Sequence, residues 1–106
     1  MIHHRRTVQI APGRQADAVA RLHEWVAIFY EASGVTMRVS VVTTGTLGRL
    51  CRSSDYESMG AREAAVAKAS GNPKAKALMA KQSQEMRDGT WPFVPGSIHE
   101  EIWRYS

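Results

Sequence analysis

The sequence predicts an α+β domain of the split βαβ type, with helices on one face of a four-stranded antiparallel sheet. Three observations lead to this fold class. A strand-like segment at 2–10 precedes an amphipathic helix at 14–32. The stretch 35–55 then contains two strand-like segments around a glycine-marked turn. Helical residues and a last alternating segment complete the order β-α-β-β-α-β, which is typical of ferredoxin-like folds.

Length and composition favour one folded domain. The chain has 106 residues, of which 43% are hydrophobic and 23% charged, so we expect a single domain over residues 1–106. Its formal net charge is +4, but the basic residues are scattered and form no dense run. The charges therefore indicate a solvated surface, and we expect no nucleic-acid partner.

Cysteine content and hydropathy indicate in which cellular compartment the protein is expected. Cys51 is the only cysteine, which excludes an intrachain disulfide and favours a reducing compartment. The start of the chain is too short and too charged for a signal peptide. No apolar run reaches the roughly 18 residues that span a membrane. We therefore expect a cytoplasmic protein with no membrane partner.

The first strand has an irregular buried face. Ile2, Val8 and Ile10 share one face by the two-residue alternation of a strand. His4 and Arg6 fall on that same face and interrupt it. The following Ala-Pro-Gly sequence ends the strand.

The helix at 14–32 has one wide apolar face with Trp25 at its margin. Gly34 is predicted to end this helix. The apolar positions recur at three- and four-residue spacing, and they are Val19, Leu22, Val26, Phe29 and Tyr30.

The hairpin is predicted to place an edge strand beside a central one. The segment 35–44 is the edge strand, the turn is at 44–46, and the central strand returns over 47–53. Ser54 or Asp55 is then predicted to cap the next helix.

The second helical region is predicted to break at Gly71 and to restart with Asn72 as cap and Pro73 at the first position. A proline-containing loop and a last strand at 97–105 follow. The predicted inner positions are Tyr56, Met59, Glu63 and Val66 before the break, and Ala75, Met79, Gln82 and Met86 after it.

The other sheet face needs a cover, because alternation places Trp103 and Tyr105 on one face of the last strand. A second copy's sheet is the simplest cover. We therefore expect a homodimer, with the edge strand that carries Arg38, Ser40 and Val42 taking part.

No pattern typical of a metal site or an activated nucleophile occurs. His3 and His4 point to opposite faces of a strand and cannot hold one metal ion together. Cys51 is better explained as a small apolar filler. We expect no metal and no cofactor, and we assign no catalytic residue.

His4 and Arg6 are the main candidates for a polar site, because a charge on a buried face is costly unless it is paired. Arg6 either meets a carboxylate such as Glu63 or Glu101, or faces a cleft where an anionic ligand completes the pair. The second alternative makes Arg6 a candidate anchor for a ligand, with His4 beside it.

Large aromatic side chains could form the walls of such a cleft. Trp25 and Tyr30 come from the first helix, and Trp91 comes from the loop before the last strand. The alternative is that they are core and interface packing. Trp91 and Phe93 are harder to explain in that way, because a loop position suits a lid.

Three short motifs resemble those of NIPSNAP-family domains. They are the opening with Met1, Ile2, Arg6, Thr7, Ile10, Pro12 and Gly13, the segment 55–63 followed by Asn72-Pro73, and the segment 93–97. The resemblance implies a dimeric α/β-barrel built from two ferredoxin-like units with facing sheets. It also implies kinship with cofactor-independent monooxygenases, haem-handling proteins and small isomerases or cyclases.

Three functional hypotheses follow. The first is a homodimer that binds a small organic ligand, anionic if it pairs Arg6, through His4, Arg6, Trp25, Tyr30 and Trp91. The second is a monooxygenase or an isomerase/cyclase that uses His4 or His23 for proton transfer. The third is an RNA-binding module with exposed aromatic residues on an open sheet face.

Overall fold

The structure is a computed structural model that describes residues 1–42 and 47–106. The predicted α+β order is confirmed, with the second helical region split in two. The predicted turn at 44–46 lies outside the described residues. The elements are β1 (Ile2–Gln9), α1 (Gln15–Ser33), β2 (Arg38–Val41), β3 (Arg49–Tyr56), α2 (Met59–Ser70), α3 (Pro73–Asp88) and β4 (His99–Arg104).

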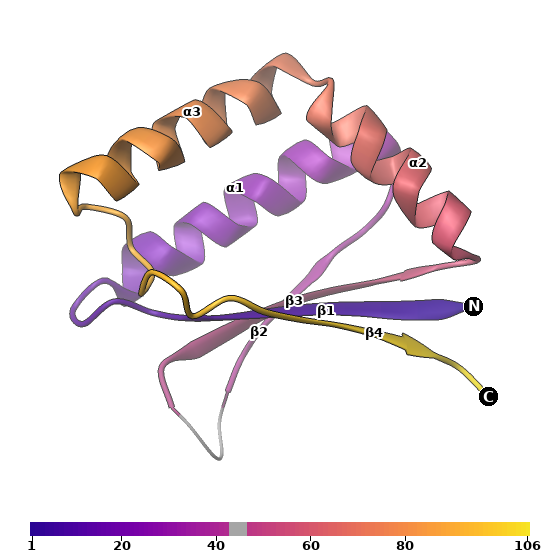
Figure 1. Ribbon diagram of the computed structural model, residues 1–106, viewed down its shortest axis with the longest axis horizontal. Helices are drawn as coiled ribbons and strands as arrows, with labels where there is room; N and C mark the ends of the chain where they lie inside the picture. Colours follow the sequence, from indigo (N-terminus) through magenta and orange to yellow (C-terminus); the bar gives the residue numbers. More distant parts are fainter. Residues whose placement is uncertain (43–46) are drawn as a thin grey trace.

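The strands form an antiparallel four-stranded sheet in the order β2-β3-β1-β4. The hairpin therefore has the predicted arrangement, with β2 at the edge and β3 inside. All three helices lie on one side of the sheet, and α3 runs beside α1 (Figure 1). In the described part of the chain, no helix covers the opposite sheet face.

Strand register decides which charged side chains face the helices. Arg6 of β1 is paired with Arg52 of β3 on one side and with Glu100 of β4 on the other. His4 lies two residues away on the same face and is paired with Ser54. These five strand positions place polar groups in the middle of the helix-covered face.

The hydrophobic core is divided into clusters on either side of these polar groups. One cluster contains Val8, Ile10, Ala18, Leu22, Leu50, Trp91 and Phe93. The other contains Ile2, Phe29, Met37, Tyr56, Ala65 and Ala69. On β1, His4 and Arg6 lie between the two clusters, so a polar zone separates two apolar ones.

The predicted face of α1 needs a correction, because the helix is covered on two sides. Tyr30 is 57% exposed, whereas Ile28 is buried against Ala75 and Leu78 of α3. Sequence periodicity alone did not indicate that α3 folds back onto α1. Gly34 ends α1 as predicted, in the left-handed conformation with φ 77°.

The start of α2 was also predicted wrongly. β3 continues to Tyr56, which pairs with Ile2, and Ser58 caps the helix by accepting a hydrogen bond from the backbone N–H of Ala61. The buried positions of α2 are Ala65 and Ala69 instead of the predicted stripe. Small side chains suffice there because α2 packs closely on its neighbours.

The predicted start of α3 is confirmed. The Asn72 side chain accepts hydrogen bonds from the backbone N–H groups of Lys74 and Ala75. Along α3 the buried residues are Ala75 and Leu78, whereas Met79 and Met86, predicted to be inside, are each 51% exposed. No helix in residues 1–42 and 47–106 is long and apolar enough to cross a membrane.

Candidate functional site

The polar zone opens into a cleft between the helices and the sheet. Two adjoining cavities of about 190 and about 200 Å³ make up this cleft. Arg6, Trp25, Arg52 and Met79 line both cavities and mark the boundary between them. We call the first cavity the apolar compartment and the second the cationic compartment.

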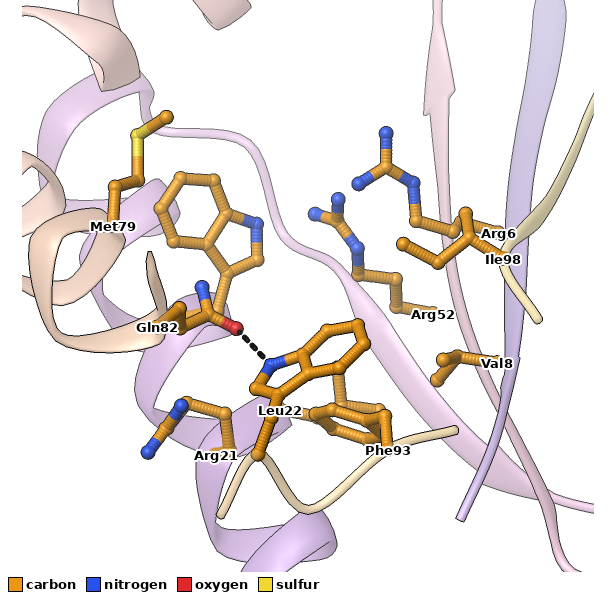
Figure 2. Close-up of a pocket in the computed structure, with 11 residues that line it drawn as sticks. Arg6, Val8, Arg21, Leu22, Arg52, Met79, Gln82, Phe93 and Ile98 are labelled. Carbon is orange, nitrogen blue, oxygen red and sulfur yellow. Dashed lines mark hydrogen bonds between the residues drawn. The ribbon is translucent and has the colours of Figure 1, made fainter. Parts of the chain in front are cut away.

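Apolar and aromatic side chains dominate the first compartment. Trp91 donates a hydrogen bond from Nε1 to Oε1 of Gln82 on α3 at 3.0 Å, drawn as the dashed line in Figure 2. The rings of Trp91 and Phe93 meet edge to face at 5.2 Å. Leu22 and Ile98 also line this space. These contacts fix the orientation of the walls.

The cationic compartment is organised around Glu100. Its Oε1 atom accepts hydrogen bonds from Nη2 of Arg6 at 3.2 Å and from Nη2 of Arg62 at 3.4 Å. It is also hydrogen-bonded to Nε2 of His4. One carboxylate is therefore hydrogen-bonded to two guanidinium groups and an imidazole.

Arg52 adds a further positive charge to the boundary of the two compartments. Its guanidinium points the same way as that of Arg6 in Figure 2. The ion pairs found within the described residues do not include Arg52. Burial lowers the pKa of Arg52 to about 10, and the nearby charge of Arg6 acts in the same direction.

The charges of the cleft do not cancel. Three guanidinium groups, from Arg6, Arg52 and Arg62, face one carboxylate from Glu100, so two positive charges are uncompensated. A fourth arginine, Arg21, is bound by both carboxylate oxygens of Glu85 at 2.6 and 2.9 Å. The excess is therefore confined to the boundary and the cationic compartment.

Three buried N–H donors in the same cleft lack a hydrogen-bond partner. They are Nε of Arg6, Nε1 of Trp25 and Nε of Arg62. Within the described residues no other buried side-chain nitrogen or oxygen is unpaired. An unpaired buried donor is costly, so this clustering of donors favours a site for an acceptor.

The protonation states in the cleft follow from burial and hydrogen bonding. Burial lowers the pKa of His4, although the hydrogen bond to Glu100 opposes this shift. Burial acts to raise the pKa of Glu100, but the His4 hydrogen bond and the charge of Arg6 outweigh it and lower the pKa. At neutral pH, His4 is thus neutral and Glu100 ionised. Because an ionised carboxylate only accepts, Nε2 of His4 carries the proton.

Four of the five predicted site residues line the cleft, namely His4, Arg6, Trp25 and Trp91. Tyr30, predicted as a wall, instead lies exposed on α1. His23 is exposed on α1 as well, so of the two histidines considered for proton transfer only His4 faces the cleft.

The carboxylate partner of Arg6 is neither Glu63 nor Glu101, the two examples that the sequence suggested. Glu101 points to the opposite sheet face and contacts His99 at 3.4 Å, and Glu63 is exposed on α2. Glu100 takes this role because the register pairs it with Arg6. Arg6 thus has an ion-pair partner, as the first alternative predicted, and its side chain also lines the cleft.

Sequence reasoning missed Arg52, Arg62 and Glu100 as members of the site. Arg52 lies two residues after Leu50 in a strand, so the two side chains share a face. This spacing is the signal that could have placed Arg52 on the buried face. No comparable signal marks Arg62, since its position depends on where α2 begins. In the described part of the chain, no group of three or more His, Cys, Asp or Glu side chains could hold a metal ion.

Comparison with solved structures defines the class of fold. A NIPSNAP domain protein from Burkholderia xenovorans superposes with a TM-score of 0.77 at 16% identity, covering 100% of this chain and 95% of that chain. A NIPSNAP family protein from Agrobacterium tumefaciens gives 0.76 at 18% identity, covering 99% and 92%. An antibiotic biosynthesis monooxygenase gives 0.68 at 9% identity, covering 100% and 99%.

The protein therefore has a ferredoxin-like α+β fold. The same fold is found in NIPSNAP domains, which confirms the predicted resemblance at the level of the fold. Comparisons with protein-family models and with curated proteins give no match.

Proposed function

We propose that the protein binds a small organic anion in the cleft between its helices and its sheet. The observation that carries this proposal is the set of three unpaired buried donors on Arg6, Trp25 and Arg62, next to an uncompensated charge on Arg52. An anion would accept from these donors and pair with the surplus guanidinium charge. A neutral ligand would leave that charge as it is.

The aromatic and aliphatic walls support an organic anion over an inorganic one. Val8, Leu22, Phe93 and Ile98 line the compartment next to the arginines. Water held against such walls is readily displaced by an apolar group. The ligand would then place its charge at the boundary and its hydrocarbon part in the apolar compartment.

The indole N–H resonances offer a direct test, because the three tryptophans lie in different surroundings. Trp25 has a free buried donor, Trp91 already donates to Gln82, and Trp103 is exposed on the other sheet face. Acetate, hexanoate and benzoate would be titrated separately at constant ionic strength. We expect at least one acid to shift the Trp25 signal in a saturable manner and to leave the Trp103 signal in place.

A matched pair of arginine variants completes the test. Arg52→Gln removes the surplus charge in the cleft, and Arg38→Gln removes an exposed charge on the edge strand. We expect Arg52→Gln to weaken binding about tenfold or more, the scale of a charge-assisted hydrogen bond. Arg38→Gln should leave the affinity unchanged. The proposal fails if no acid moves the Trp25 signal, or if the two variants bind alike.

We also propose that the protein forms a homodimer through its open sheet face, in the cytoplasm as its single cysteine suggests. Trp103 and Tyr105 are 55% and 54% exposed on that face. Large exposed aromatic side chains are favoured at protein interfaces. A monomer in solution would instead favour the RNA-binding hypothesis, which also needs exposed aromatic residues there.

A further inference from the structure

We infer that the anion bound in the cleft is a carboxylate attached to a single aromatic ring. This inference rests on the proposed function and specifies its ligand class. It follows from the size of the apolar compartment, the shape of its walls and the position of its charges.

The size of the apolar compartment limits the hydrocarbon part to about one ring. Its volume is about 190 Å³. A buried apolar cavity of about 150 Å³ holds one benzene molecule, whereas pockets for drug-sized ligands begin near about 300 Å³. A one-ring acid therefore fits the apolar compartment, and a fused polycyclic ligand would extend beyond its walls.

The walls favour a flat ring over a flexible chain. Trp25, Trp91 and Phe93 supply aromatic surfaces, and the Trp91–Phe93 edge-to-face contact shows that their planes are inclined by 68°. The ring of the ligand gains edge-to-face or offset contacts against such walls. It also loses fewer internal rotations on binding than an alkyl chain of equal carbon number.

The position of the charges indicates one anionic group at one end of the ligand. Arg6 and Arg52 lie at the boundary, where the apolar compartment meets the cationic one. The remaining cation of the apolar compartment, Arg21, is engaged by Glu85. A second carboxylate on the ring would therefore meet apolar walls and an already neutralised arginine.

A set of matched probes tests the ligand class. Benzoate, cyclohexanecarboxylate, hexanoate, acetate and benzyl alcohol would be titrated while the indole N–H of Trp25 and the methyl groups of Val8 and Ile98 are followed by NMR. We expect benzoate to bind about tenfold more tightly than hexanoate and than benzyl alcohol. Among the acids, benzoate alone should produce ring-current shifts of the methyl signals.

The second part of the test uses a variant in the lining of the apolar compartment that is expected to fold. Ile98 lines the apolar compartment and is 47% exposed, so Ile98→Ala should leave the fold intact. We expect it to weaken benzoate about threefold and acetate not at all, since a shortened side chain loses contact with the ring only. Equal losses for both acids would contradict the inference.

The outcomes separate this inference from the proposal on which it rests. If hexanoate or cyclohexanecarboxylate binds as tightly as benzoate, the aromatic class is overturned and anion binding stands. If benzyl alcohol binds as tightly as benzoate, the carboxylate is not recognised, and this inference fails. If none of the acids shifts the Trp25 signal, both the ligand class and the proposed function fail.

Discussion

The guanidinium carbon of Arg52 lies 5.6 Å from the centre of the Trp25 ring. The face of an indole ring attracts a cation, but more weakly than a carboxylate does in a desolvated site. Arg52 is therefore held in the cleft by an aromatic surface and keeps its charge available. This arrangement costs stability in the absence of an anion, and the cost can be measured.

Replacing Arg52 with methionine is expected to stabilise the protein. Arg52→Met removes a charge that burial disfavours and keeps an unbranched side chain beside Trp25. We expect the free energy of unfolding to rise by about 1 kcal/mol, measured by urea denaturation without added carboxylates. Arg87→Met, at an exposed position on α3, should change it by less than about 0.5 kcal/mol. A loss of stability in Arg52→Met would show that the charge is already paired.

Replacing Glu100 with glutamine is expected to have the opposite effect. Glu100→Gln leaves Arg6, Arg52 and Arg62 facing one another without a carboxylate. We expect a loss of about 1–2 kcal/mol in urea denaturation, less than for a fully buried pair because Glu100 is partly exposed. Glu63→Gln, at an exposed position on α2, is the control, and it should have little effect.

The same Glu100 variant provides a check on the anion site. A carboxylate bound at the boundary of the two compartments would pair with arginines whose charge Glu100 no longer offsets. Benzoate should therefore restore more stability to Glu100→Gln than to the wild-type protein. Equal stabilisation of the two would mean that the anion binds elsewhere.

The fold could be predicted from the sequence because local patterns and topology agree. Alternation, helical spacing and the glycine-marked hairpin each indicate one element, and few topologies join elements in this order. Errors arose where tertiary contacts overrode the local pattern. β3 runs through the predicted cap at Ser54 and Asp55 because it pairs with β1 as far as Tyr56.

The site could be predicted only in part, because its members depend on register. His4 and Arg6 disturb an otherwise apolar face, which is visible in the sequence. Glu100 becomes their partner through the alignment of β4 with β1, and a shift of one residue would have placed Glu101 there instead. Arg62 reaches the cleft from a helix whose start was misplaced by several residues.

The depressed pKa of His4 predicts a loss of stability on mild acidification. Its folded-state pKa lies below the ordinary value of 6.5, so between these two values the unfolded chain binds more protons than the folded one. Stability is then highest above pH 6.5 and falls as the pH drops through 6.5 towards the folded-state pKa. Urea denaturation at pH 7.5 and 5.5 should show this decrease.

Histidine variants assign that decrease to the cleft. His4→Gln can still donate to Glu100 but cannot take up a proton, so its stability should change less between pH 7.5 and 5.5. His23→Gln, at an exposed position on α1, should retain the full decrease. If both variants retain it, the titrating group lies elsewhere. Glu85 and Glu100 have lowered pKa values and contribute only at pH values below about 4.5.

The open sheet face gives the last prediction, which concerns assembly. On this face, Oδ1 of Asp55 accepts a hydrogen bond from Oη of Tyr105 at 3.0 Å and lies 2.7 Å from Nδ1 of His3. Trp103 stands next to this network, since it pairs with His3 across the strands. A second copy packed on this face would cover both aromatic side chains.

Sedimentation equilibrium tests the dimer with one variant on each side of the molecule. Trp103→Asp places a charge on the open face, and Met86→Asp places one on the exposed side of α3. We expect the wild-type protein and Met86→Asp to sediment as dimers, and Trp103→Asp to shift towards the monomer because a buried unpaired charge is costly. A dimer that persists in Trp103→Asp would place the interface elsewhere, and a wild-type monomer at micromolar concentration would exclude a stable dimer.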